Sequence, residues 1–207
     1  MKRIIFSLSV LMFLASSCVV KVACVGDSIT EGAGIARQSI SAYPVVLDSL
    51  LGKNYVVLNA GRSAATLQKN GDLPYWNCNE FSNVFVFKPR IIVIKLGTND
   101  TKPQNWKLGN YEADYQALID TFSTIKPKPQ IYLCKPVPVF GTRWGINDST
   151  LVHGVIPAIE RLAAVNHLKI IDLNSGLMDE KKNFPDFIHP NEHAAAIMAE
   201  IVSKSIK

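Results

Sequence analysis

Short apolar runs, each followed by small polar residues, are the strongest constraint on how this chain of 207 residues can fold. Three such runs, residues 19–25, 55–58 and 91–96, end at Gly26-Asp27-Ser28, Asn59-Ala60-Gly61 and Gly97-Thr98-Asn99-Asp100. Residues 130–134 and 169–172 form two further runs. Short apolar runs closed by turn residues are typical of buried strands. The sequence therefore predicts five strands inside one core.

Segments with helical spacing lie between these runs. We expect helices over residues 42–51, 81–87, 110–125, 150–166 and 191–205. The periodicity of 81–87 fits a helix or a strand, and the break at Lys88-Pro89-Arg90 favours the helix. Pro157 is expected to kink its helix, and Asn191 is a candidate N-cap. The alternation of strands and helices predicts an α/β fold with a parallel sheet covered on both faces.

The polar motifs should meet at one edge of this sheet, because the carboxyl ends of parallel strands lie together. Near the end of the chain, Asp186-Phe187-Ile188-His189 adds an acid three residues before a histidine. A serine becomes a nucleophile when a base takes its proton, and histidine titrates near neutral pH. A carboxylate on the other ring nitrogen fixes the tautomer. We expect Ser28 to be the nucleophile, His189 the base and Asp186 its orienting partner.

Attack on an ester carbonyl creates an oxyanion, which needs hydrogen-bond donors already directed at it. We expect these donors to be the backbone N–H groups of Ser28 and Gly61 and the side-chain amide of Asn99. A glycine has no Cβ to keep a substrate from its N–H. Asp27 and Asp100 are expected to brace their loops.

These four motif blocks, in this order, resemble the SGNH (GDSL-type) hydrolases over about residues 20–205. The resemblance implies a flavodoxin-like, three-layer α/β/α fold and an esterase with the triad and oxyanion donors named above. It implies no metal and no organic cofactor. The chain departs from the family where Arg62-Ser63-Ala64-Ala65 stands in place of a second glycine, and where His193-Ala194 follows the catalytic histidine. The Gly-x-Ser-x-Gly elbow of standard α/β-hydrolases does not occur.

A narrower resemblance concerns the substrate. Residues 95–106 and 134–138 resemble secreted bacterial sialate O-acetylesterases and acetylhydrolases. This implies short acyl groups on sugars such as sialic acid. Candidate substrate-binding residues are Arg62, Trp106, Arg143 and Trp144, and Arg62 is the cation expected to meet a sialic acid carboxylate.

Two other functions stay open. A lysophospholipase or thioesterase for longer acyl chains would need a long apolar groove, for which the sequence gives no sign. A catalytically silent carbohydrate-binding protein on the same fold would not need the complete triad.

The first residues resemble an export signal. Lys2 and Arg3 precede an apolar stretch at 4–14 and the small residues 15–17, which is the three-part form of a secretory signal peptide. We expect residues 1–17 to be removed and 19–207 to form a single exported domain, periplasmic or secreted. The stretch is too short for a membrane span, and Cys18 leaves a lipid anchor open.

Composition narrows the remaining classes. The chain is 48% hydrophobic and 19% charged, as in ordinary globular proteins. Its formal charge of +5, partly from Lys2 and Arg3, is too small to predict nucleic-acid binding. The four cysteines lack the spacing of a zinc site or disulfide framework. The oligomeric state cannot be read from the sequence.

Overall fold

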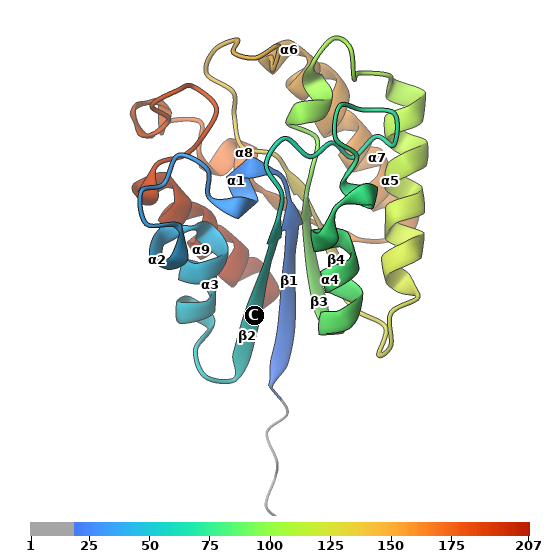
Figure 1. Ribbon diagram of the computed structural model, residues 1–207, viewed down its shortest axis with the longest axis vertical. Coiled ribbons are helices and arrows are strands. Elements are labelled where there is room, and N and C mark those ends of the chain that lie inside the picture. Colours follow the sequence, from blue (N-terminus) through green and yellow to red (C-terminus); the bar gives the residue numbers. More distant parts are fainter. Residues whose placement is uncertain (1–18) are drawn as a thin grey trace, which may run out of the picture.

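The computed structural model describes residues 19–207, so the predicted signal segment 1–17 and Cys18 lie outside the described residues. Five parallel strands form one sheet in the order β2-β1-β3-β4-β5 (Figure 1). The strands are β1 (Val20–Gly26), β2 (Tyr55–Gly61), β3 (Ile91–Lys95), β4 (Gln130–Lys135) and β5 (Lys169–Asp172). This is the flavodoxin-like order, and the predicted α/β fold is confirmed.

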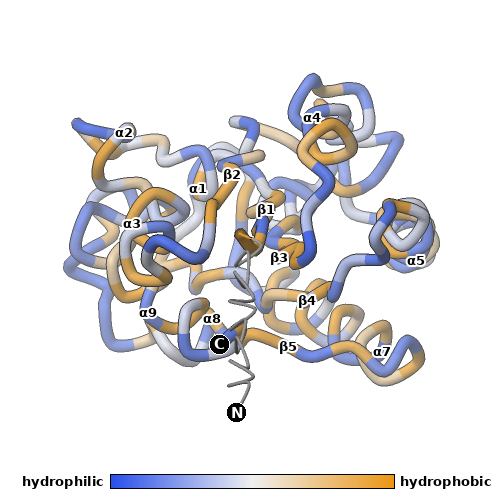
Figure 2. Tube along the Cα trace, turned by 90° about the horizontal axis from the view of Figure 1, so that it is seen from below, coloured by the Kyte–Doolittle hydropathy of each residue, from blue (hydrophilic) through white to orange (hydrophobic). Residues whose placement is uncertain are grey.

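Helices cover both faces of the sheet (Figures 1 and 2). One layer holds α3 (Tyr43–Leu51), α8 (Leu173–Gly176) and α9 (Glu192–Ile206). The other layer holds α4 (Asn79–Phe87), α5 (Leu108–Ser123) and α7 (Ile156–Asn166).

Successive strand residues point to opposite layers. Val22 and Cys24 of β1 pack with the α3 and α9 layer, whereas Ala23 and Val25 pack with the other layer. All five residues of β3 are buried. A strand covered on both faces favours apolar residues at successive positions, which explains the continuous apolar run at 91–94; the fifth residue, Lys95, is also buried.

The helix predicted over 150–166 forms and contains a π-helical turn. The chain forms α6 (Asp148–Thr150), then a π-helical turn at Leu151–Val155, and then α7. Pro157 lies in the first turn of α7, where its missing N–H costs little. The wider turn lies immediately before Pro157 and the backbone stays helical on both sides of it, so a π-helical turn stands where the sequence predicted a kink.

Several short elements lie in segments that the sequence left without structure. They are α1 (Ser28–Glu31), α2 (Gln38–Ser41) and three 3-10 turns at Tyr75–Asn77, Asn99–Thr101 and Lys181–Asn183. A single turn is too short to show a hydrophobic period. Two of these elements, α1 and the turn at Asn99–Thr101, begin at predicted site residues.

The end of β2 packs directly against α1. A Cβ on Gly61 would lie 2.2 Å from the backbone nitrogen of Glu31 and 2.6 Å from the carbonyl carbon of Thr30. These are backbone atoms and cannot rotate away. Gly61 is therefore required by the close approach of β2 and α1.

We expect Gly61→Ala to lower the free energy of unfolding by about 1–3 kcal/mol, the usual cost of overpacking. Urea denaturation measures this. The matched control is Gly109→Ala in α5, where an added Cβ meets nothing within 4 Å and the better helix propensity should be neutral or stabilising. Equal stability of the two variants would contradict the packing role of Gly61.

Candidate active site

Ser28 is presented by a tight junction between β1 and α1. Gly26 ends the strand where an added Cβ would lie 2.8 Å from the carbonyl oxygen of Lys95. The side chain of Asp27 caps α1, because its Oδ1 accepts the N–H of Ile29 at 3.0 Å. Each residue of the Gly-Asp-Ser motif thus has a separate role: the glycine allows close approach to β3, the aspartate caps α1, and the serine presents its hydroxyl.

A buried ion pair lies directly behind this junction. The Lys95 ammonium contacts Asp27 Oδ1 at 2.7 Å, and both side chains are fully buried. Lys95 also donates to the Thr98 hydroxyl at 3.4 Å. The pair connects the carboxyl ends of β1 and β3, which carry Ser28 and Asn99.

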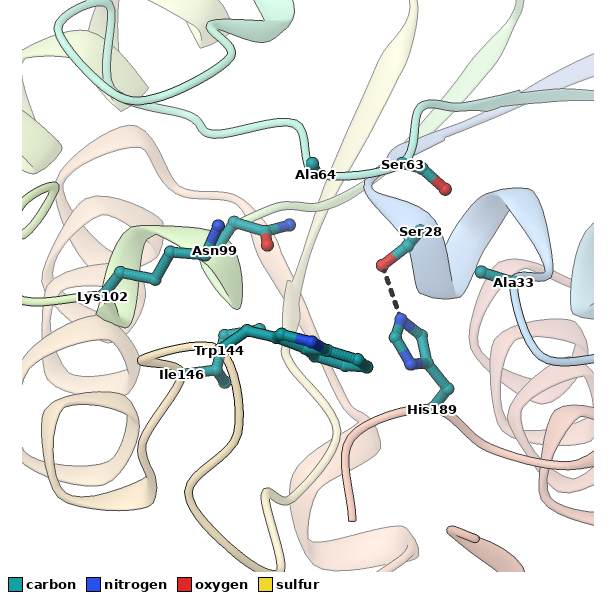
Figure 3. Close-up of a pocket in the computed structure, with 9 residues that line it drawn as sticks. All are labelled: Ser28, Ala33, Ser63, Ala64, Asn99, Lys102, Trp144, Ile146 and His189. Carbon is teal, nitrogen blue, oxygen red and sulfur yellow. Dashed lines mark hydrogen bonds between the residues drawn. The ribbon is translucent and has the colours of Figure 1, made fainter. Parts of the chain in front are cut away.

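The three residues predicted as a triad form one chain of hydrogen bonds, and Figure 3 shows the bond between Ser28 and His189. The distance from Asp186 Oδ2 to His189 Nδ1 is 2.7 Å, and that from His189 Nε2 to Ser28 Oγ is 2.9 Å. A carboxylate only accepts hydrogen bonds, so Nδ1 carries the ring proton of a neutral His189. Nε2 is then free to accept the proton of the Ser28 hydroxyl.

Asp186 is held as a charged acceptor. Its Oδ1 accepts the backbone N–H groups of Ile188 at 3.0 Å and His189 at 2.7 Å. Burial alone would raise the pKa of Asp186, but these bonds and the contact with the His189 ring hold that pKa below its ordinary value. The carboxylate therefore stays ionised at neutral pH and keeps the imidazole in one tautomer.

Asn99 lines the cavity beside Ser28. One hydrogen of its amide group goes to the carbonyl oxygen of Ala65 at 3.1 Å. This bond fixes the plane of the amide, and the second N–H is available to a ligand. Asn99 is therefore brought to the site that the sequence predicted for it.

Gly61 does not reach this cavity. Its N–H donates to Asn59 Oδ1 at 3.0 Å, and the loop residues that line the cavity are Ser63 and Ala64. The prediction of Gly61 as an oxyanion donor is therefore corrected by the geometry: Gly61 packs against α1, and the loop approaches Ser28 three residues later.

Ala64 has the features of a backbone donor. Its φ of +65° places it in the left-handed region, at one of the positions where the family often has a second glycine. The N–H groups of Arg62, Ser63 and Ala65 are all bonded within the protein. Within residues 19–207, the N–H of Ala64 has no hydrogen-bond partner in the protein. The sequence signal was the missing second glycine after Gly61.

A carboxylate holds this loop in place. Glu31, in α1, accepts the Ser63 N–H at 2.8 Å and also bonds the Ser63 hydroxyl. Its backbone carbonyl accepts from the Asn59 amide at 3.3 Å. The loop that carries Ala64 is thus fastened to the helix that begins with Ser28.

Asp100 braces the same loop from the other side, as the sequence predicted. Its two carboxylate oxygens accept the backbone N–H groups of Leu67 and Gln68, both at 2.9 Å. Complete burial raises the pKa of Asp100 to about 6, although these hydrogen bonds oppose the shift.

A cavity of about 240 Å³ opens at Ser28. Figure 3 shows its lining: Ser28, Ala33, Ser63, Ala64, Asn99, Lys102, Trp144, Ile146 and His189. Of the predicted substrate-binding residues, Trp144 is on this wall and Arg143 stacks on the Trp144 ring at 4.3 Å. Arg62 lies at a separate hollow with Cys78 and Glu80.

Trp106 is a packing residue and does not line the cavity. Its ring centroid lies 5.4 Å from that of Tyr111, and a Cβ on Gly154 would approach its ring to 2.4 Å. Its indole packs against the hydrophobic core instead of facing a ligand.

Comparison with known proteins agrees with this geometry. The model of the GDSL-like Lipase/Acylhydrolase family matches residues 24–197. The chain belongs to this family. The chain is also 39% identical, over 91% of its length, to an acetylxylan esterase from Xylanibacter ruminicola. It spans only 43% of the length of that relative.

Solved structures show the same fold. An aryl esterase from M. smegmatis aligns with a TM-score of 0.77 at 18% identity, covering 91% of this chain and 98% of that one. A carbohydrate acetylesterase from Sinorhizobium meliloti aligns with a TM-score of 0.74 at 16% identity, covering 90% and 98%. The prediction of a GDSL-type hydrolase is confirmed at the level of the family.

Two kinds of feature are absent from the described part of the chain. Residues 19–207 contain no cluster of three His, Cys, Asp or Glu residues placed to hold a metal ion. Within the same residues, no helix is both long and apolar enough to cross a membrane.

The raised pKa of Asp100 predicts a pH-dependent stability. A carboxyl whose folded pKa is about 6, against 3.8 unfolded, stabilises the fold below pH 4 and loses this contribution as the pH rises through 6. The stability difference between the wild type and Asp100→Asn should therefore shrink by about 2 kcal/mol between pH 4 and pH 7. Urea denaturation across this range measures it, and a difference that grows with pH would contradict the assignment.

Proposed function

We propose that this chain hydrolyses acetyl esters of carbohydrates. The hydrogen-bonded chain from Ser28 through His189 to Asp186, opening onto a small cavity, is the observation that carries the proposal. The relationship to an acetylxylan esterase supports a sugar acetate as the substrate class.

The roles of the groups in this reaction follow from the geometry. His189 Nε2 takes the proton of Ser28 Oγ as that oxygen attacks the ester carbonyl, and Asp186 stabilises the imidazolium. The N–H groups of Ser28 and Ala64 and the amide of Asn99 receive the oxyanion. His189 then gives its proton to the leaving alcohol oxygen, which leaves acetyl-Ser28. Water, deprotonated by the same imidazole, attacks the acetyl carbonyl. The bond to Ser28 Oγ then breaks, His189 returns the proton to that oxygen, and acetate is released.

The cavity favours a short acyl group and a neutral sugar. Its volume of about 240 Å³ lies below the range of about 300–1,000 Å³ typical of sites for drug-sized ligands, which argues against a long acyl chain. Arg62, the cation expected to meet sialic acid, lies at another hollow. Lys102 lines the cavity, but its ammonium is 3.3 Å from Asp72. We therefore favour xylan-type acetates over O-acetylated sialic acids.

We also propose that the protein is exported. The support is the signal-like segment 1–17 alone. Xylan and other polymeric sugars are met outside the cell, so this location fits the proposed substrate.

The decisive experiment measures hydrolysis of acyl esters from acetyl to long-chain by residues 19–207, with Ser28→Ala as the control. We expect a steep preference for acetyl, and a loss of at least about 10³-fold in kcat in Ser28→Ala. A preference for long chains would instead support the lysophospholipase or thioesterase alternative. Failure of the wild type to react with a fluorophosphonate serine probe would support the silent sugar-binding alternative.

The oxyanion role of Asn99 has its own test. Asn99→Ala should lower kcat for an acetyl ester by about 10²–10³-fold with little change in KM, because the amide acts on charge that develops in the transition state. Steady-state kinetics with a circular dichroism spectrum as a folding check measures this. A rise in KM at unchanged kcat would place Asn99 in ground-state binding.

A further inference from the structure

An exposed tryptophan stands at the mouth of the cavity. Trp144 is 56% exposed, yet its ring lines the cavity together with Ser28 and His189. Its ring centroid lies 5.7 Å from that of His189. Figure 3 shows the indole lying between Asn99 and His189, on the opposite side of the opening from Ser63 and Ala64.

The backbone at Trp144 is unusual for such a large side chain. Trp144 and Gly145 both have positive φ, +53° and +80°. Two hydrogen bonds close the turn, Ile146 N–H to Arg143 O at 2.9 Å and Arg143 N–H to Ile146 O at 3.3 Å. Paired positive φ values are those of a type I′ hairpin, which favours Asn or Gly at both central positions. A bulky residue there costs about 1–2 kcal/mol, so the turn itself does not explain the tryptophan.

Hydrogen bonds fix the segment that carries the hairpin to two other parts of the site. Asn147 donates its side-chain amide to the Thr101 carbonyl oxygen at 2.9 Å, close to Asn99. The N–H of Phe140 donates to the Phe187 carbonyl oxygen at 3.0 Å, close to His189. The indole is therefore carried by a loop that is tied to both halves of the active site.

Arg143 supports the ring without entering the cavity. Its guanidinium carbon lies 4.3 Å from the centroid of the indole, a cation–π contact. Because Arg143 is outside the cavity lining, the part of the ring that faces the cavity is left open to a ligand.

The chemistry of the triad says which part of a substrate lies here. His189 Nε2 returns its proton to the leaving alcohol oxygen, so that oxygen must come within hydrogen-bond reach of the imidazole. The group bonded to this oxygen then lies beside the indole of Trp144, which is next to His189. In a sugar acetate, the group bonded to this oxygen is the sugar ring.

We propose that Trp144, backed by Arg143, is the platform on which the sugar ring of the substrate stacks during deacetylation. The inference rests on the proposed function, and it names Trp144 as a specificity-determining residue for the alcohol half of the ester. A half-exposed, rigidly held aromatic ring offers large contact area to a sugar at low entropic cost.

The test compares two acetyl esters on the full domain. Trp144→Asn removes the ring and puts in a residue that tolerates the left-handed backbone, so the variant should fold at least as well as the wild type. We expect KM for acetylated xylo-oligosaccharides to rise about tenfold, a factor within the range of aromatic stacking. With ethyl acetate, whose alcohol is too small to cover the indole, kcat/KM should change by less than about twofold. Aryl acetates are avoided because their leaving group would also stack.

Two further variants sharpen the comparison. Trp144→Phe keeps an aromatic ring and should recover most of the affinity for the sugar ester. Val86→Asn, an exposed apolar residue on α4, is the matched control and should behave as the wild type on both esters. An equal loss on both esters in Trp144→Asn would show that the ring acts through His189 and would overturn the platform. Unchanged kinetics on both esters, or a gain with longer acyl groups, would also overturn it.

A binding experiment separates this inference from the proposed function. Titration calorimetry of Ser28→Ala with xylotetraose, with and without Trp144→Asn, measures the platform without catalysis. We expect the second substitution to weaken binding about tenfold. If Trp144→Asn weakens binding but the wild type hydrolyses no sugar acetate, the proposed activity is refuted and the platform stands. If the wild type hydrolyses sugar acetates but Trp144→Asn leaves xylotetraose binding unchanged, the platform is refuted and the proposed activity stands.

Discussion

The buried ion pair between Lys95 and Asp27 is the interaction on which the site depends. Both side chains are fully buried and their charged atoms are 2.7 Å apart. Loss of one partner from such a pair typically costs about 3–5 kcal/mol, because the other charge is left without compensation in the core. The pair sits where β1 and β3 end, and so it fixes the start of the Ser28 turn relative to the strand that leads to Asn99.

Hydrogen bonds of three further side chains extend this frame outward. Glu31 holds Ser63, Asp100 holds the N–H groups of Leu67 and Gln68, and Asn147 holds Thr101. Each joins a loop to a neighbouring loop or short helix at the carboxyl edge of the sheet. Catalysis by electrostatic stabilisation needs donors that do not reorient during the reaction, and these bonds restrain the segments that carry the donors of the proposed reaction.

The sequence predicted most of the regular structure, because continuous apolar runs and helical spacing are strong local signals. The strand expected at 91–96 and found at Ile91–Lys95 is one example. The motifs that hold Ser28, Asp186 and His189 also meet as expected, in one chain of hydrogen bonds. Prediction failed where the outcome depends on tertiary packing. Gly61 lacks a Cβ, as suits a backbone donor, yet it packs against α1. The residue of this loop that reaches the cavity is Ala64, and its positive φ is visible only in the structure. Trp106 packs against Tyr111, a placement that residue type alone does not predict.

The direction of β1 has a consequence for anything joined to the front of this domain. The strand begins at Val20 and delivers Ser28 just beyond its far end, after seven residues that span about 20 Å. An anchor or a neighbouring domain attached ahead of Val19 would meet the amino-terminal edge of the sheet, while the cavity opens at the opposite edge. A tether at this end would therefore leave the mouth of the cavity turned outward, where a large ligand can approach without passing the point of attachment.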